Sequence, residues 1–175
     1  MKHISTYLHH FWPFFMVLVC QSLSAMQQDS TKESIRLLAA IVAGDEYAVR
    51  RLLSDGADAN AVITCHGKTT SALYHAAQER HLNIVQLLLG RNANPNTDDA
   101  QGVTPLMLAA KPIDETEGSV HAVKRLTAEQ PRIIAALLEH GAKPELQNGE
   151  STQAADYALV GTRSKQLFEA KAEKK

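Results

Sequence analysis

The stretch Thr104-Pro105-Leu106-Met107-Leu108-Ala109-Ala110 matches Ser71-Ala72-Leu73-Tyr74-His75-Ala76-Ala77 position by position. Ala76 and Ala109 are 109 − 76 = 33 residues apart. A Leu-rich run followed by a turn comes after each copy, and a third such run precedes both. In chain order these are Leu52-Leu53 with Gly56-Ala57-Asp58, Leu87-Leu88-Leu89 with Asn92-Ala93-Asn94, and Leu137-Leu138 with Gly141-Ala142-Lys143. A fixed period of this kind predicts structural repeats that pack one on the next.

The residues around the second copy predict how its helix begins and packs. Gly102 suits a tight turn, and the Thr104 hydroxyl can accept hydrogen bonds from free N–H groups of the first helical turn. Pro105 then stands at the first helical position, where its missing N–H costs nothing. Ala109 and Ala110 are small, which predicts a close approach of two helices at this point.

The turns after the second helices need a left-handed backbone. Gly56 adopts positive φ without a Cβ clash. Asn92 stands at the corresponding position of the next unit, and asparagine tolerates this conformation better than most residues. Both residues therefore predict the ends of helices.

The period and the two matching stretches resemble the ankyrin repeat, a unit of this length with a Thr-Pro-Leu-His-x-Ala signature. The resemblance implies an all-α solenoid of about four helix-turn-helix repeats, joined by β-hairpin-like loops, over residues 34–170. We expect the units, with an insertion in the third and a tail after the last, at residues 34–62, 66–98, 99–145 with insertion 111–132, and 146–170, followed by the tail 171–175.

Two units depart from the regular period. Ala40 and Ala76 are 36 residues apart, which predicts about three extra residues near Ile63-Thr64-Cys65. Ala109 and Ala158 are 49 residues apart, or 33 + 16, which indicates about sixteen extra residues within 111–132.

The insertion has a helical pattern of its own. Gly118-Ser119 can start a short helix with Val120, Val123 and Leu126 on one side, and Thr127-Ala128-Glu129-Gln130 has the form of a second capping box. Such a helix either packs on its own repeat or binds a partner, and the sequence leaves both open.

In the first repeat, the apolar stripe of the first helix is predicted to be Ile35, Leu37, Leu38 and Ile41.

The first 25 residues have the pattern of a signal peptide, followed by a linker at residues 26–33. Lys2 precedes an apolar run from Phe11 to Cys20, which is too short to span a membrane, and small residues around Ala25 suit cleavage. Cleavage after Ala25 leaves 175 − 25 = 150 residues. We therefore expect an exported protein, periplasmic in a bacterium and otherwise secreted, with no membrane attachment after cleavage. An uncleaved membrane tether is the alternative.

Charge and composition argue against a nucleic-acid partner. The chain has 18 basic and 19 acidic residues, and one Trp, four Phe and four Tyr. Nucleic-acid binding would need a basic face with aromatic side chains for stacking. With Cys20 removed alongside the signal, Cys65 cannot form an intrachain disulfide.

Few residues suggest chemistry. The strong metal-binding spacings CxxC and HExxH are absent from the sequence, and we expect no cofactor and no metal. A small hydrolase or metal protein using Cys65 and His66 is the least favoured hypothesis, because adjacent residues of a hairpin seldom point the same way. His75 is expected to be a packed, hydrogen-bonded core residue and His140 to lie near a helix C-terminus.

The resemblance implies partner binding by hairpin tips and by the exposed side of the first helices. The residues that match these positions, together with the apolar side of the insertion, are Lys68, Thr70, Gln78, Glu79, Asp98, Gln101, Val103, Lys111, Val120, Val123 and Leu126. We expect a non-catalytic, monomeric module that binds another exported protein and regulates or neutralises it. A secreted effector that docks on a host protein is the alternative.

Overall fold

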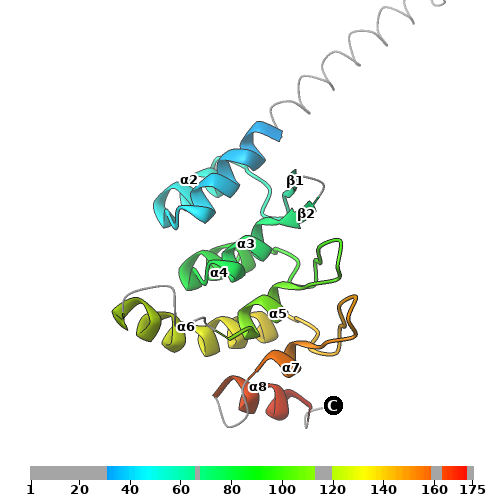
Figure 1. Cartoon of the computed structure of the whole chain (residues 1–175). Helices are drawn as coiled ribbons and strands as arrows, with labels where there is room; N and C mark the ends of the chain where they lie inside the picture. Colours follow the sequence, from blue (N-terminus) through cyan, green and yellow to red (C-terminus); the bar gives the residue numbers. More distant parts are fainter. Residues whose placement is uncertain (1–30, 66–67, 113–119, 159–162, 173–175) are drawn as a thin grey trace, which may run out of the picture.

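The computed structural model describes residues 31–65, 68–112, 120–158 and 163–172, which form four stacked helix pairs (Figure 1). The first pair is the helix over residues 31–42 with α2 (Glu46–Ser54). The others are α3 (Ala72–Gln78) with α4 (Leu82–Leu89), α5 (Pro105–Ala110) with α6 (Val120–Glu139), and α7 (Ala154–Tyr157) with α8 (Arg163–Ala172). The predicted all-α solenoid is confirmed.

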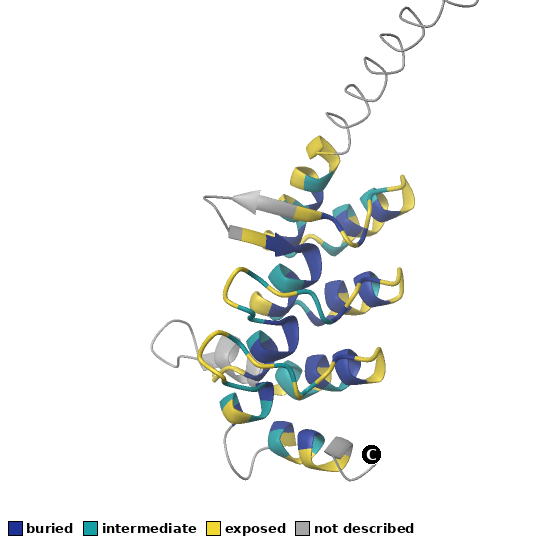
Figure 2. Cartoon of the chain, turned by 90° about the vertical axis from the view of Figure 1, so that its right-hand side faces the viewer, coloured by how far each residue is buried: buried dark blue, intermediate teal, exposed yellow. Residues whose placement is uncertain are grey.

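One hydrophobic core runs through the whole stack. Figure 2 shows the buried segments recurring from one helix pair to the next. Leu73 and Leu106 occupy equivalent positions and are both buried, as are Ala76 and Ala109. Helices α3 and α5 pack against each other, and each contains one of these buried alanines. Small buried residues at these positions agree with the predicted close packing of helices.

The predicted helix starts and turns are also confirmed. Thr104 accepts a hydrogen bond from the Met107 N–H at 3.3 Å, and Pro105 stands in the first turn. Gly102 has φ +75°, Gly56 has φ +103° and Asn92 has φ +60°. These positions therefore follow from local chemistry alone.

The extra residues between the first two repeats form a regular hairpin. Strand β1 (Val62–Cys65) pairs antiparallel with β2 (Lys68–Ser71), with Val62 opposite Ser71 and Cys65 opposite Lys68. In the later loops the described residues form only one isolated bridge, between Gln147 and Gln153. The lengthened loop thus allows a strand ladder to form.

The prediction of a separate short helix in the insertion is wrong. The structure has a single helix, α6, of 20 residues, so residues 120–132 extend the second helix of the third repeat. Pro131 lies inside this helix and has no N–H to donate to the carbonyl one turn before it, a loss that other contacts can offset. Gln130 makes two such contacts, because its Nε2 donates to the Ala110 carbonyl at 3.2 Å and the Lys111 carbonyl at 3.1 Å.

The stripe predicted for the first helix needs one correction. Leu37 and Ile41 are fully buried and Leu38 is half-buried, but Ile35 is 55% exposed. Ile35 corresponds to Ser71 of the next repeat, which is buried. The difference is explained by position, since among the described residues no helix pair precedes the first repeat.

Two asparagines tie successive repeats together. The Oδ1 of Asn60 accepts from the Asn94 N–H at 2.8 Å, and its Nδ2 donates to the Asn92 carbonyl at 3.2 Å. Asn96 stands 36 residues later and makes the same pair of bonds to the Lys143 N–H (2.8 Å) and the Gly141 carbonyl (3.0 Å). Each amide thereby bridges to the helix-ending turn of the following repeat.

We expect Asn96→Ala to destabilise the fold by about 1–3 kcal/mol, because it removes two hydrogen bonds worth roughly 0.5–1.5 kcal/mol each. The measurement is the urea midpoint at constant slope. Gln86→Ala, on the exposed side of α4, is the matched control and should change the midpoint little. Equal midpoints for the two variants would contradict a tie between repeats.

Candidate partner-binding surface

The connecting loops are stacked along one side of the solenoid (Figure 1). The loop before α5 is organised by Asp99, whose Oδ1 accepts from the N–H groups of Gln101 and Val103, both at 2.9 Å. Its Oδ2 accepts from the Tyr74 hydroxyl at 3.0 Å. The loop is therefore fixed internally and also joined to α3.

The next loop uses the same device. Asn148 lies 49 residues after Asp99, the spacing of Ala109 and Ala158, and its Oδ1 accepts from the N–H groups of Glu150 (3.0 Å) and Thr152 (2.9 Å). The Gly149 N–H donates to the Gln101 carbonyl at 2.7 Å, which joins the two loops. The loop side of the solenoid is thus a preorganised surface, which lowers the entropic cost of binding.

Five of the predicted contact residues are exposed on this structure. Gln78 and Glu79 lie at the C-terminal end of α3, and Lys111 lies at that of α5, with Gln78 and Lys111 at equivalent positions of successive repeats. Asp98 and Gln101 are exposed on the loop before α5. We call these five residues the rim.

Two predicted contact residues instead face the protein interior. Thr70 is only 8% exposed, and its Oγ1 lies 2.8 Å from His75 Nε2. Val103 is half-buried and packs against the core. Both lie next to a helix start, where the chain turns inward, so placing them on the rim was wrong.

The remaining predicted positions are described only in part. Lys68 begins β2, and Val120, Val123 and Leu126 lie in the first two turns of α6, but their side chains fall outside the described residues. His66 also lies outside, while the backbone of Cys65 ends β1. Within the described residues no group of three His, Cys, Asp or Glu side chains could hold a metal ion.

Tyr74 and His75 were missed as neighbours of the rim. Their rings meet edge to face, with centroids 5.6 Å apart. Burial, together with the Asp99 carboxylate, raises the pKa of Tyr74 to about 12. Burial lowers the pKa of His75, opposed in part by Glu79. The predicted packed, hydrogen-bonded His75 is therefore confirmed, although it is half-exposed rather than deeply buried.

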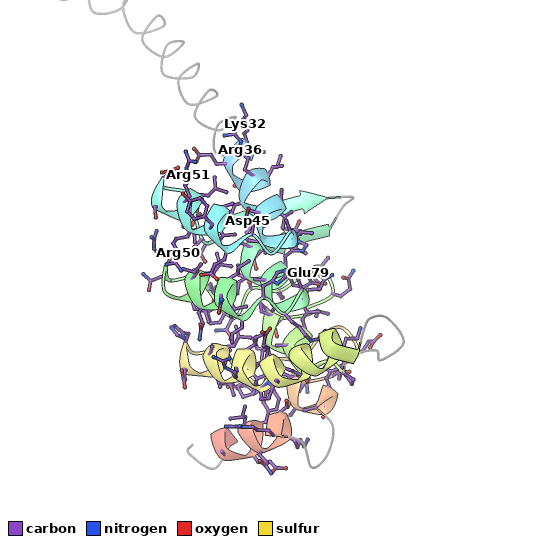
Figure 3. The ribbon with its side chains drawn as sticks, turned by 90° about the vertical axis from the view of Figure 1, so that its left-hand side faces the viewer. Lys32, Arg36, Asp45, Arg50, Arg51 and Glu79 are labelled. Carbon is purple, nitrogen blue, oxygen red and sulfur yellow. The ribbon has the colours of Figure 1, made fainter. Side chains whose placement is uncertain are left out.

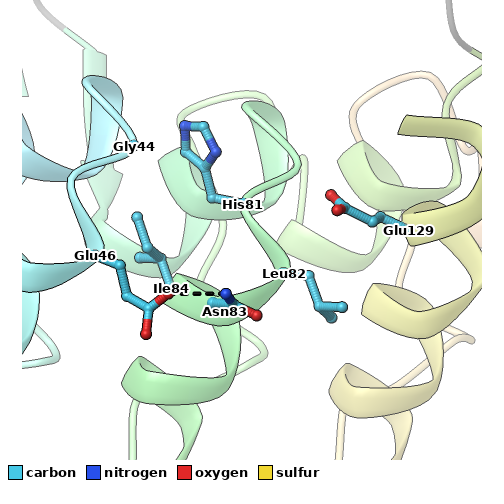
Figure 4. Close-up of a pocket in the computed structure, with 7 residues that line it drawn as sticks. All are labelled: Gly44, Glu46, His81, Leu82, Asn83, Ile84 and Glu129. Carbon is cyan, nitrogen blue, oxygen red and sulfur yellow. Dashed lines mark hydrogen bonds between the residues drawn. The ribbon is translucent and has the colours of Figure 1, made fainter. Parts of the chain in front are cut away.

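A small polar cavity of about 140 Å³ lies between the first three repeats, lined by Gly44, Glu46, His81, Leu82, Asn83, Ile84 and Glu129 (Figure 4). Glu46 accepts from Arg50 and Asn83, each at 2.8 Å, and these bonds lower the pKa of its carboxyl group. Sequence reasoning missed this cavity, because Glu129 reaches it only through the extension of α6.

His81 forms one wall of the cavity and immediately precedes α4. Its ring lies so close to Gly44 that a Cβ there would be 2.8 Å from Cε1. The buried Nε2 has no hydrogen-bond partner among the residues that the structure describes. Among the described residues, neither Cys65 nor any Ser or Thr lines the cavity, so it has no hydroxyl or thiol nucleophile there.

None of the described helices combines the length and the apolar character needed to cross a membrane. Residues 1–30, which contain the predicted signal peptide, lie outside the described residues.

Comparison with known families matches residues 37–148 to the description "Ankyrin repeats", in 3 copies. The chain is 36% identical over 83 residues to the 2-5A-dependent ribonuclease of Mus musculus, covering 47% of this chain and 11% of that protein. It is 30% identical over 166 residues to the mitochondrial disaggregase of Bos taurus, covering 83% of this chain and 23% of that protein. The chain thus spans less than a quarter of either relative.

Among solved structures, the chain is similar to the ankyrin repeat domain of Bcl-3, a member of the IkappaB protein family. The TM-score is 0.59 at 25% identity, over 76% of this chain and 50% of that one. The similarity spans more than the repeats matched by the family description.

The shifted pKa of His75 predicts a pH dependence of stability. Because burial lowers this pKa in the folded chain, the unfolded chain binds the proton more readily, and stability falls as the pH drops below about 6.5. His75→Leu, which copies Leu108 of the next repeat, should reduce this loss between pH 7.5 and 5, as measured by urea midpoints. Thr70→Val removes the hydrogen bond but keeps the imidazole, so it should preserve the slope. The same slope in His75→Leu would contradict the assignment.

Proposed function

Because this chain belongs to the ankyrin-repeat family, a family of protein–protein interaction modules, we propose that it acts by binding another exported protein and regulating or neutralising it. The observation that supports this proposal is the rim: five exposed polar side chains on a backbone held by hydrogen bonds between successive repeats. Such a surface loses little conformational entropy on binding.

The fold is typically non-catalytic, and the site residues fit that reading. The core takes up most of the apolar side chains, and the rim residues are short or flexible polar groups without a paired nucleophile and base. Recognition by the outer surface is therefore the activity that these residues support best.

Export is the second part of the proposal and rests on residues 1–25. A basic residue, a short apolar run and small residues before position 26 are the three parts of a signal peptide. The partner would then be an exported enzyme or toxin, which a small stoichiometric binder can regulate. A host protein would be the partner if the chain is delivered as an effector.

Binding can be tested by capturing the partner with the tagged chain, purifying both proteins, and measuring affinity by calorimetry. We expect a 1:1 complex and a loss of affinity of about tenfold or more for the double variant Gln78→Ala with Lys111→Glu, because central contacts dominate affinity. Gln166→Ala with Arg163→Glu, on exposed positions of α8, is the matched control. Equal losses in both variants would reject the rim as the binding surface.

Export can be tested by cell fractionation and intact mass. We expect the exported form to lack residues 1–25 and to contain 175 − 25 = 150 residues. A Lys2→Glu change should slow processing, because the positive charge at the start of a signal peptide is reversed. Recovery of the uncut chain in the membrane fraction would support the tether instead.

A further inference from the structure

Within the described residues, no element covers the outward side of the first repeat. Its helix over residues 31–42 buries Leu37 and Ile41, whereas Ile35 is 55% exposed. Arg36 is exposed and Ala40 half-buried. The counterparts of these positions in the second repeat follow 36 residues later.

In the second repeat the same positions are covered. Ser71, Ala72 and Ala76 correspond to Ile35, Arg36 and Ala40, and all three are buried. The preceding helix pair is what covers them, because α3 lies between the first and third repeats (Figure 2). The first repeat therefore presents a surface that, one repeat later, is an interface.

The second helix of the first repeat shows the same difference. Ala48 and Leu52 are half-buried, but their counterparts Ile84 and Leu88 are fully buried. Tyr47 is 75% exposed and corresponds to Asn83. Because Asn83 donates to Glu46 of the preceding repeat at 2.8 Å, this position faces the preceding unit.

These six residues define the N-terminal end face: Ile35, Arg36, Ala40, Tyr47, Ala48 and Leu52. Five of the six are apolar or aromatic. A solenoid normally needs a polar outer face on its terminal repeat to remain soluble. An end face of this composition is instead typical of a surface that another protein covers.

Basic side chains lie on and beside the N-terminal end face. Figure 3 shows Lys32, Arg36 and Arg51 at this end of the molecule. Within the described residues, Lys32 and Arg36 have no ion-pair partner at hydrogen-bonding distance, although the exposed Glu33 lies between them in sequence. Arg51 has a loose partner, Asp55, at 3.8 Å. Like charges would oppose one another if two copies met through this face, so a partner that carries carboxylates fits better.

We propose that the N-terminal end face binds an acidic amphipathic helix of a partner protein. Apolar side chains of that helix cover Ile35, Tyr47 and Leu52, and carboxylates beside them meet Lys32 and Arg36. The helix then lies where, for the second repeat, the preceding helix pair lies. The proposal rests on the proposed function only in that the chain binds proteins, since the rim lies on other residues.

The first test uses two synthetic peptides of about 18 residues, or five helical turns. Both carry Leu and Ala on one face; one has Glu and the other Lys along the edges. Fluorescence anisotropy with the full chain should give about tenfold tighter binding of the Glu peptide, less at high salt. Equal binding of the two peptides, or binding of neither, would overturn the proposal.

Charge reversal locates the site. Lys32→Glu with Arg36→Glu should make the Lys peptide the tighter ligand, because the border of the N-terminal end face changes sign. Lys143→Glu with Arg163→Glu reverses two exposed charges elsewhere and should keep the original order. If both double variants reverse the order, the attraction is diffuse and the proposal fails. Gln78→Ala with Lys111→Glu should leave peptide binding unchanged, so failure of the rim and failure of this face are distinguishable.

A photo-crosslinker identifies the occupant directly. Replacing Tyr47, which is 75% exposed, by benzoylphenylalanine keeps an aromatic ring at the N-terminal end face without disturbing the core. Irradiation with the Glu peptide should give a one-to-one adduct by mass spectrometry. A covalent dimer would instead show a second copy on this face, and a link to residues 1–30 would show that the chain covers itself. Either result would overturn the proposal.

Discussion

The close approach of α3 and α5 is the constraint on which the rest of the structure depends. Ala76 and Ala109, one in each helix, are fully buried, so a larger side chain at either position would have to displace its neighbours. The stacking of the helix pairs also brings the loops of successive repeats within hydrogen-bonding distance. Only then can Asn96 reach the turn of the following repeat and Tyr74 reach Asp99. The preorganised rim is thus a consequence of helix packing made elsewhere.

The insertion disturbs this regularity at one point, and the structure compensates with side chains. In the first two repeats the turn itself caps the first helix, since the Asp45 and His81 N–H groups donate to the carbonyls of Ala40 and Ala76. In the third repeat the backbone at Lys111 is extended, with ψ 136°, and residues 113–119 lie outside the described residues. At this helix end the side chain of Gln130 donates to the Ala110 carbonyl, and Arg80 donates to the Lys111 carbonyl at 2.7 Å. This arrangement fixes the middle of α6 beside His81 and creates the polar cavity as a by-product.

The features that could be predicted from the sequence are those set by nearby residues. A hydroxyl before a proline predicts the start of α5, and the periodic alanines predict the core. The errors have a common cause, which is that exposure depends on a neighbour distant in sequence. Ile35 belongs to an apolar stripe, yet no helix pair among the described residues covers it. Thr70 belongs to a hairpin, yet it is buried and hydrogen-bonded to His75. The single helix α6 was missed because its capping signal at residue 127 is overridden by packing of Gln130 on α5.

The two ends of the stack differ in a way that local chemistry does not require. Exposed positions of α8 include Arg163, Gln166 and Glu169, which water solvates readily. The first repeat exposes Ile35 and Tyr47 at the other end. Since each repeat can bury its faces only against neighbours, an uncapped end lowers solubility unless something covers it. Stability of the solenoid does not depend on that cover, because the core from Leu37 to Phe168 is continuous without it. The core does not need the apolar end face, so this face can bind a partner separately from the rim.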